Sequence, residues 1–303
     1  MTLSQAIRHI EKQLPELELL KDEPMERHCS FRIGGPAAAF ARPRGEEELE
    51  YLCQLLAGAD IEPLIVGKGT NLLVTDGNVE RFVIQLGEGL SSVRRVGQDR
   101  LYAEAGITLA RLASAAQEWG LAGLEFAHGI PGSLGGGVFM NAGAYGGELK
   151  DVVTAADFLD SDRERFRLPA ARLDFGYRHS VFSDADTVIL GAELRLTPDD
   201  PEAIRERMRT LAEKRRASQP LDLPSAGSTF KRPKTGYAAA LIDQCGLKGY
   251  RVGGAMVSEK HAGFVVNAGG ASFADVLAVV EHVQETVLRE TGVELEPEVR
   301  IIQ

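Results

Sequence analysis

The sequence predicts a mixed α/β or α+β protein made of two packed units. Apolar patterns with helical and strand periods are mixed along the whole chain. The length of 303 residues is close to that of two average domains. The composition changes at Asp199-Asp200-Pro201, where an acidic N-cap and a proline start a heavily charged helix. We therefore expect one domain over residues 1–198 and a second over residues 199–303.

The first unit is expected to open with a helix and then to mix strands and helices. Its apolar residues follow helical steps of three or four: Leu3, Ile7, Ile10 and Leu14. Thr2 and Gln5 have the spacing of a capping box at its start. The later elements are expected in this order: a helix near 46–56, strands 63–66, 82–86 and 101–105, a helix 108–119 ended by Gly120, and strands 152–159 and 188–196.

The second unit is expected to begin with the charged helix, which runs for about 17 residues from Pro201. The elements expected after it are a short helix 237–245 ended by Gly246, strands 252–257 and 263–267, a long helix starting at Ser272, and a final strand 298–302. The alternation of both element types in each half supports two mixed units rather than one all-helical or all-strand domain.

The charge balance and the chain ends exclude several classes of protein. Lys and Arg total 34 against 44 Asp and Glu, so the net charge of −10 argues against nucleic acid or an anionic membrane as a partner. No apolar run is long enough to span a bilayer, and the charged N-terminus has no signal peptide pattern. Three widely spaced cysteines favour neither a disulfide framework nor a metal site, so a cytoplasmic location is expected.

Glycine is enriched and concentrated. The 33 glycines make roughly 11% of the chain, against a usual share of about 7%. Eight of the 21 residues in the stretch 128–148, HGIPGSLGGGVFMNAGAYGGE, are glycine. Such a segment lets a ligand approach the backbone and turns N–H groups toward an anion, and Ser133, Asn141 and Tyr145 add side-chain hydrogen bonding. A structural loop with tight turns is the alternative.

A second glycine element, VGKGTNLLV at residues 66–74, follows an expected strand. It is neither a Walker A motif nor a GxGxxG fingerprint, because position 72 is leucine. Taken alone, it indicates an ordinary β-turn at least as strongly as a phosphate site. Together with the stretch 128–148, it indicates a ligand that contains a diphosphate.

Six motifs occur in one order along the chain. They are VGKGTNLLV, GIPGSLGGGVFMNAGAYGGE, GYRHS, PSAGSTFKRP, LIDQCGLKGYRVGGAMVS followed by HAGFVVN, and EPEVRII. From Phe31 to Ile302 the chain closely resembles the UDP-N-acetylenolpyruvoylglucosamine reductase family of bacterial cell-wall synthesis. No single motif is specific, but the six in register are.

The resemblance implies an α+β flavoprotein with an FAD-binding fold of the vanillyl-alcohol-oxidase type. In that fold, two α+β lobes, here divided near residues 75–80, are followed by a separate α+β substrate domain. The family uses NADPH to reduce the enolpyruvyl ether of UDP-N-acetylglucosamine to UDP-N-acetylmuramate and needs no metal. Hydride comes from N5 of the reduced flavin.

The resemblance also assigns residues to the two ligands. The expected FAD contacts are Val66, Gly67, Lys68, Gly69, Thr70, Asn71, Leu72, Pro131, Gly132, Ser133, Gly136, Asn141, Ala142, Gly143 and Ala144. The expected contacts to the sugar nucleotide are Arg178, Lys231, Arg232, Lys248, His261 and Asn267. The cations among them suit a diphosphate, although a solvated surface lysine or arginine remains the alternative for each.

Three residues are expected to carry the chemistry. Arg178 would offset the charge of the substrate carboxylate through a bidentate fork. Glu298, if burial keeps it protonated, would donate to the developing enolate, and Ser228 would supply the proton. Each has an alternative without a catalytic role: a surface arginine, an outward-facing strand glutamate, and a serine that caps a turn.

The sequence departs mildly from the family pattern. Cys29 stands where a threonine is common, and Ser133-Leu134 replaces Thr-Val. No long insertion separates Tyr177 from Asp199, which places the chain in the branch without a substrate-clamping tyrosine.

Two other functions stay open. One is an FAD-dependent oxidase or dehydrogenase of the same fold that acts on a small alcohol and does not need Arg178, Ser228 and Glu298 together. The other is a sugar-nucleotide binding protein without redox activity, which would be colourless when purified.

Overall fold

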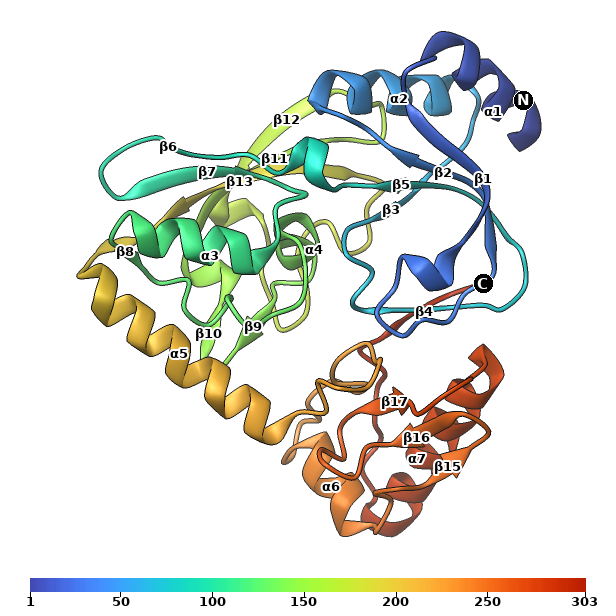
Figure 1. The fold of residues 1–303 in the computed structure, drawn as a ribbon, viewed down its shortest axis with the longest axis vertical. Coiled ribbons are helices and arrows are strands. Elements are labelled where there is room, and N and C mark those ends of the chain that lie inside the picture. Colours follow the sequence, from blue (N-terminus) through green and yellow to red (C-terminus); the bar gives the residue numbers. More distant parts are fainter. The chain divides into compact units, whose positions relative to one another are not determined.

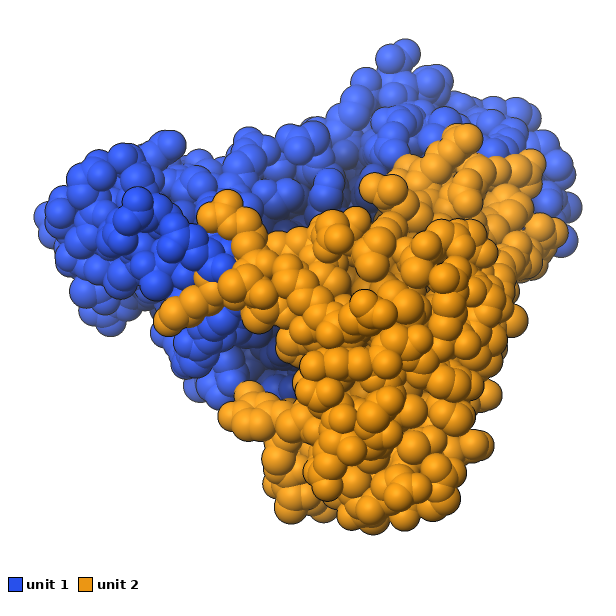
Figure 2. Space-filling model, turned by 60° about the horizontal axis from the view of Figure 1, so that its bottom comes forward, with its two compact units in different colours: residues 1–21, 38–68, 81–213 blue, residues 22–37, 69–80, 214–303 orange.

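The computed structural model describes all residues, 1–303, and the chain divides into two compact units (Figures 1 and 2). Unit 1 consists of residues 1–21, 38–68 and 81–213, and unit 2 of residues 22–37, 69–80 and 214–303. Each unit has its own hydrophobic core. The units are discontinuous in sequence, whereas the expected domains 1–198 and 199–303 are contiguous. The assignment of FAD and substrate to those two domains stays a prediction.

The largest sheet of unit 1 has five strands in the order β12-β11-β13-β7-β6, with all neighbours antiparallel. The strands are β6 (Val93–Arg95), β7 (Arg100–Glu104), β11 (Val153–Leu159), β12 (Arg165–Pro169) and β13 (Val188–Arg195). Helices α3 (Leu109–Glu118) and α4 (Leu134–Phe139) cover one face (Figure 1). Two short strand pairs complete this region: β8 (Leu121–Ala122) with β14 (Thr197–Pro198), and β9 (Gly143–Ala144) with β10 (Gly147–Glu148).

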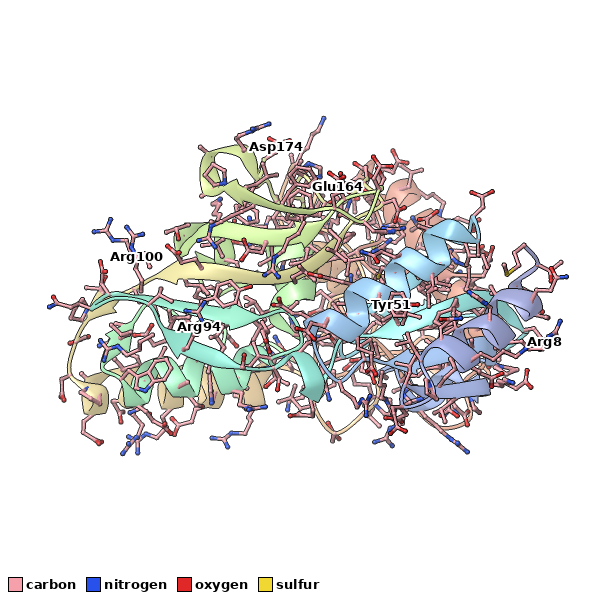
Figure 3. The ribbon with its side chains drawn as sticks, turned by 90° about the horizontal axis from the view of Figure 1, so that it is seen from above. Arg8, Tyr51, Arg94, Arg100, Glu164 and Asp174 are labelled. Atoms are coloured by element: carbon pink, nitrogen blue, oxygen red, sulfur yellow. The ribbon has the colours of Figure 1, made fainter.

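Charged side chains are paired along this sheet. Arg94 and Arg100, both labelled in Figure 3, lie on β6 and β7. The Arg94 guanidinium lies 5.0 Å from the centre of the Tyr102 ring, and Arg100 contacts Glu193 at 3.0 Å. Arg167 bridges Asp157 and Glu193. Such paired charges suit an exposed sheet surface and leave the opposite face to the helices.

A four-stranded sheet has the order β1-β2-β5-β3. Its strands are β1 (Glu18–Pro24), β2 (Pro36–Arg42), β3 (Leu64–Val66) and β5 (Val79–Gln85), of which β3 and β5 are parallel. Helices α1 (Leu3–Gln13) and α2 (Glu46–Gly58) bury their apolar faces in the core of unit 1. The expected capping box of Thr2 and Gln5 is confirmed.

Helix α5 (Pro201–Ser218) begins at the expected proline. Near its start, Arg207 pairs with Glu125 at 2.7 Å and with Asp199 at 2.6 Å. Only Ile204 and Met208 of this helix are buried, in agreement with its highly charged sequence. No helix of the protein is both long and apolar enough to cross a membrane.

Unit 2 contains a three-stranded antiparallel sheet of β15 (Arg251–Val252), β16 (Ala255–Val257) and β17 (Val265–Asn267). Its helices are α6 (Ala238–Gln244) and α7 (Phe273–Thr291), and β18 (Arg300–Ile302) pairs in parallel with β4 (Leu72–Val74). The expectation of one strand over residues 252–257 is wrong. Gly253 has a φ of +51°, and the chain turns there between two antiparallel strands.

The start of α7 is tied to that turn by Asp275. Its carboxylate accepts hydrogen bonds from the N–H groups of Ser272, at 3.0 Å, and Gly254, at 3.2 Å. These backbone donors hold the pKa of Asp275 below its ordinary value. The bonds therefore stabilise the folded protein above the pKa of the unfolded chain and are lost as the pH falls through the lower folded pKa.

We expect Asp275→Asn to lower the thermal midpoint at neutral pH by about 2–4 °C, because a capping contact commonly contributes about 1 kcal/mol. The difference from wild type should shrink as the pH falls from about 3.9, the usual value for Asp in an unfolded chain, through the lower folded pKa of Asp275, because the stabilisation by its carboxylate is lost over that range. Thermal unfolding followed by circular dichroism between about pH 2 and 7 checks this. An equal difference at both ends of that range would contradict it.

Candidate active site

The glycine-rich stretch 128–148 is anchored to the five-stranded sheet of unit 1. The N–H of Leu134 donates to Ile107 O and that of Gly135 to Ala105 O, both at 2.8 Å. A Cβ on Gly135 would lie 2.9 Å from the Ala105 Cβ, so glycine allows α4 to approach the end of β7. The expectation of a loop throughout this stretch is corrected by the presence of α4 and the β9–β10 pair.

The two glycine elements meet in unit 1 at Gly67 and Ser133. A Cβ on Gly67 would lie 2.2 Å from Ser133 Oγ, and Ser133 is only 3% exposed. Gln85 Nε2 donates to Gly67 O at 3.1 Å and fixes the chain where it leaves β3. The two elements are therefore in contact within unit 1, and their contacts with FAD stay a prediction.

The rest of the second glycine element, residues 69–74, lies in unit 2, where it supports the C-terminal strand. Gly69 has a φ of +61°, and its carbonyl accepts from the N–H of Ser30 at 3.1 Å. Asn71 Nδ2 donates to the carbonyl of Glu298 at 3.0 Å, while Asn71 O accepts from the N–H of Arg300 at 2.9 Å. Asn71 therefore holds the segment that carries Glu298.

Ser228 and Glu298 are brought together within unit 2. The N–H of Glu298 donates to the carbonyl of Thr229, the neighbour of Ser228, at 2.8 Å. Thr229 is itself fixed, because its N–H donates to Gly263 O at 2.8 Å and its Oγ1 accepts from the N–H of Val265 at 2.9 Å. Ser228 is exposed beside this buried anchor. Two of the three expected catalytic residues thus lie on paired segments.

Arg178 belongs to unit 1 and occupies a two-residue turn with Tyr177. Gly176 and His179 close the turn with backbone hydrogen bonds of 3.0 and 3.4 Å. Arg178 has a φ of +54°, which a residue with a side chain adopts only when its surroundings hold it there. Its Nη2 donates to Gly143 O at 3.4 Å, and its guanidinium lies 5.0 Å from the centre of the Tyr177 ring.

The residues expected to bind the sugar nucleotide all lie in unit 2, apart from Arg178. Lys231 pairs with Glu296, Lys248 with Asp243 at 2.8 Å, and Arg232 lies 4.8 Å from the centre of the Tyr237 ring. Burial and the nearby Lys248 cation lower the pKa of His261, so its imidazole is neutral at neutral pH. Asn267 donates to Phe31 O and accepts from the N–H groups of Gly269 and Ala271.

Two further residues of the candidate site were not expected from the sequence. His128 opens the glycine-rich stretch, and its Nδ1 atom is buried without a hydrogen-bond partner in the protein. An unpaired buried nitrogen beside a glycine-rich segment suits a ligand that completes its hydrogen bonding. Tyr237 is 61% exposed beneath Arg232. For His128 the sequence does carry a signal of a site residue, its position directly before Gly-Ile-Pro-Gly. For Tyr237 it carries none.

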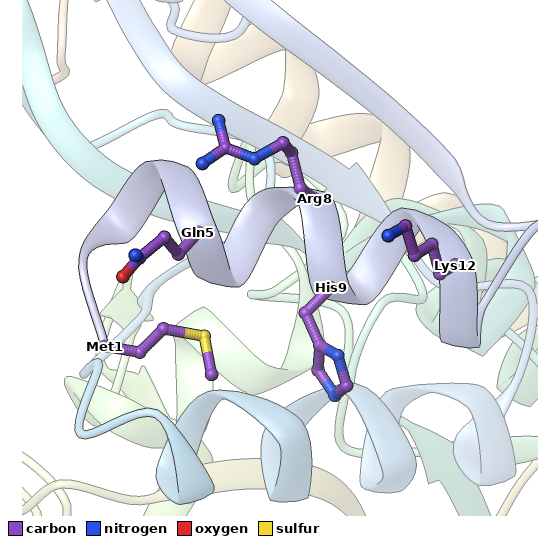
Figure 4. Close-up of a pocket in the computed structure, with 5 residues that line it drawn as sticks. All are labelled: Met1, Gln5, Arg8, His9 and Lys12. Atoms are coloured by element: carbon purple, nitrogen blue, oxygen red, sulfur yellow. The ribbon is translucent and has the colours of Figure 1, made fainter.

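A separate surface pocket lies along α1 (Figure 4). It is lined by Met1, Gln5, Arg8, His9 and Lys12, and it contains none of the expected site residues. No group of three or more His, Cys, Asp or Glu side chains is arranged to hold a metal ion. The expected site residues lie elsewhere: in unit 1 on the glycine elements and the Arg178 turn, and in unit 2 on the segments that carry Ser228 and Glu298.

Comparisons with known proteins match both halves of the chain. A family model described as an FAD binding domain matches residues 37–168, and one described as the UDP-N-acetylenolpyruvoylglucosamine reductase C-terminal domain matches residues 219–302. The chain is 48% identical to a UDP-N-acetylenolpyruvoylglucosamine reductase of Agathobacter rectalis, with 98% of each chain covered. It is 45% identical to the enzyme of that name from Caldanaerobacter subterraneus, with 95% of each covered.

A solved structure supports the same relationship. The crystal structure of UDP-N-acetylenolpyruvylglucosamine reductase from Thermus caldophilus matches with a TM-score of 0.81 and 34% identity, covering 95% of this chain and 99% of that one. The expected α+β class with an FAD-binding domain is confirmed. Identity at this level over almost the whole of both chains leads to one conclusion: the chain belongs to the UDP-N-acetylenolpyruvoylglucosamine reductase family.

Proposed function

We propose that this chain is an FAD-dependent reductase that uses NADPH to convert the enolpyruvyl ether of UDP-N-acetylglucosamine to UDP-N-acetylmuramate. The observation that carries the proposal is the pairing of the Ser228 and Glu298 segments through Thr229 O and Glu298 N. The other flavoenzyme considered above would not need the segments of Ser228 and Glu298 to be paired. Full-length similarity to reductases of this name supports the same choice.

The residues present fit FAD. Gly67 and Ser133 bring the two glycine elements into contact, and the buried Nδ1 of His128 has no hydrogen-bond partner in the protein. These groups lie in unit 1, within or close to the part matched by the FAD-binding model. When bound, FAD takes hydride from NADPH and passes it to the double bond of the substrate.

The protein supplies orientation, charge and a proton. Arg178 binds the carboxylate of the enolpyruvyl group and offsets its charge, which makes the conjugated double bond a better acceptor. The Ser228 hydroxyl gives its proton to the second carbon, and Glu298 donates a hydrogen bond to the enolate oxygen as negative charge develops there. Lys231, Arg232 and Lys248 offer cations to the diphosphate, with His261 and Asn267 beside them.

A cytoplasmic location belongs to the same proposal. All three cysteines are free thiols, Cys29 and Cys53 buried and Cys245 partly buried. Burial raises the pKa of the Cys53 thiol to about 12, so it stays protonated and unreactive. Thiols of this kind suit a reducing compartment.

The test is a pair of measurements on the purified full chain. We expect a yellow protein whose flavin absorbance is bleached by NADPH and restored by UDP-N-acetylglucosamine enolpyruvate. A colourless chain that does not take up FAD would favour the sugar-nucleotide binding protein. A bound flavin that a small alcohol reduces, and that the enolpyruvyl substrate fails to reoxidise, would favour the oxidase.

A further inference from the structure

Asn141 is fully enclosed and fully engaged within the protein. Its exposed fraction is 0%, and its backbone has a φ of +45°. Nδ2 donates to Glu148 Oε2 at 2.8 Å and to the carbonyl of Gly176 at 2.9 Å, and Oδ1 accepts from the N–H of Lys150 at 2.9 Å. Two acceptors facing one end of the amide and a donor facing the other fix its orientation. Both N–H bonds are therefore used inside unit 1.

The Gly176 carbonyl belongs to the first residue of the turn that carries Arg178. It also accepts from the N–H of His179, so Asn141 holds the turn at the bond that closes it. The other side of the turn is held by Ser180, which is fully buried and whose Oγ donates to Phe139 O at 2.6 Å. Asn141 therefore binds the turn at Gly176, and Phe139, the last residue of α4, binds the chain just after the turn at Ser180.

Glu148 completes this arrangement. Its pKa is lowered first by the hydrogen bond from Lys150 and further by the bond from Asn141 and the charge of Arg178. The carboxylate is therefore ionised and acts as an acceptor for Asn141 at neutral pH. Its partner Lys150 lies 2.8 Å away.

We propose that Asn141 is a positioning residue that holds the Arg178 turn in its strained conformation, rather than a ligand of FAD as the family resemblance implied. The inference rests on the proposed role of Arg178 toward the substrate carboxylate. A turn with a residue at positive φ relaxes when its anchors are removed, and a relaxed turn no longer presents the guanidinium fork in one place. Asn141 acts through that turn and not on the cofactor.

The test is Asn141→Asp in the FAD-loaded enzyme. The carboxylate keeps the size of the amide but faces Glu148 and the Gly176 carbonyl without a donor. We expect the dissociation constant of the enolpyruvyl substrate to rise about tenfold, since a buried acceptor left without its donor commonly costs a factor of about 5–150. FAD content and the rate of flavin reduction by NADPH should stay at wild-type values. Asn78→Asp, the same change at an exposed position, is the matched control and should have no effect.

Two further variants separate the contacts. Asn141→Asp combined with Glu148→Gln restores a donor between positions 141 and 148 but not the bond to Gly176, so substrate binding should stay weak. Full recovery would overturn the proposal. Ser180→Ala combined with Ser183→Ala removes the other anchor, because both hydroxyls donate to Phe139 O, and should give the same weak binding with unchanged flavin reduction. If Asn141→Asp fails to fold, this double variant decides: the same split supports the proposal, and its absence overturns it.

Amide hydrogen exchange over residues 174–180 measures the turn without any substrate. Faster exchange in Asn141→Asp supports the positioning role, whereas unchanged exchange overturns it. Loss of FAD with normal substrate binding in the loaded fraction would also overturn it, because Asn141 would then be a cofactor ligand. If wild-type enzyme fails to use the enolpyruvyl substrate while exchange still responds to the variant, the proposed function fails and the positioning role stands.

Discussion

Ser228→Ala is expected to slow reduction of the enolpyruvyl substrate by about 10²–10⁴-fold, the usual contribution of a positioned proton donor. Flavin reduction by NADPH should proceed at the wild-type rate, because that step needs no proton from this hydroxyl. The variant should fold normally. Ser228 is exposed, and the local backbone is fixed by Gly227, with a φ of +78°, and by the buried Thr229. Stopped-flow absorbance of the flavin separates the two half-reactions.

A matched control lies in the same segment. Ser225 offers its backbone carbonyl to Ser30 Oγ, so Ser225→Ala keeps that contact and should behave as wild type in both half-reactions. Ser228→Cys retains an acidic proton at the same position and should recover part of the lost rate. Wild-type turnover in Ser228→Ala would remove the serine from the mechanism and leave Glu298 as the candidate proton source.

The elements that the sequence predicts well are those with local signals. The capping box at Thr2, the start of α7 at Ser272 and the apolar faces of α1, α2 and α7 all depend on residues within a few positions of one another. Strand β1 was missed because its sequence, ELLKDEP, is mostly charged, and it is a strand only through its place beside β2. Edge strand β12 was missed for the same reason, since four of its five residues are exposed.

Helix α4 shows where local propensity misleads. Three of its six residues are glycine, and each glycine disfavours a helix by about 1 kcal/mol relative to alanine. The helix forms because Ala105 and Ile107 accept its first N–H groups and because Gly135 allows close packing on β7. Those partners lie about 30 residues away in the sequence, so no short window contains them.

The candidate site shows the same division between local signals, which the sequence carries, and long-range contacts, which it does not. The motifs identify residue types, and the family resemblance assigns them roles, but neither shows how each side chain is already used. Asn141 was expected to bind FAD, yet both of its amide N–H groups donate within unit 1. The pairing of Thr229 with Glu298 depends on segments nearly 70 residues apart. His128 has a sequence signal in its position before Gly-Ile-Pro-Gly, but the absence of a partner for its Nδ1 is a property of burial that only the structure shows.

Gly69→Ala is expected to produce the largest loss of stability in the candidate site. Gly69 has a φ of +61°, and a Cβ there would lie 2.0 Å from the carbonyl oxygen of His28 and 2.9 Å from the Cα of Cys29. Both obstacles are backbone atoms, which cannot rotate away as the end of a side chain can. The strained backbone and the clash together should lower the free energy of unfolding by about 2–6 kcal/mol.

Gly270→Ala is the control that separates the two causes. Gly270 has a φ of +65°, but a Cβ there would meet no atom within 4 Å, so it should cost only about 1–2 kcal/mol. Denaturant unfolding of the two variants beside wild type measures the difference, and equal losses would show that the His28 backbone yields.

Gly69 lies two residues before Asn71, which holds the segment of Glu298, so a Gly69→Ala protein that still folds should also reduce the enolpyruvyl substrate more slowly. Loss of stability with an unchanged substrate rate would show that the Asn71 contact does not depend on the Gly69 turn.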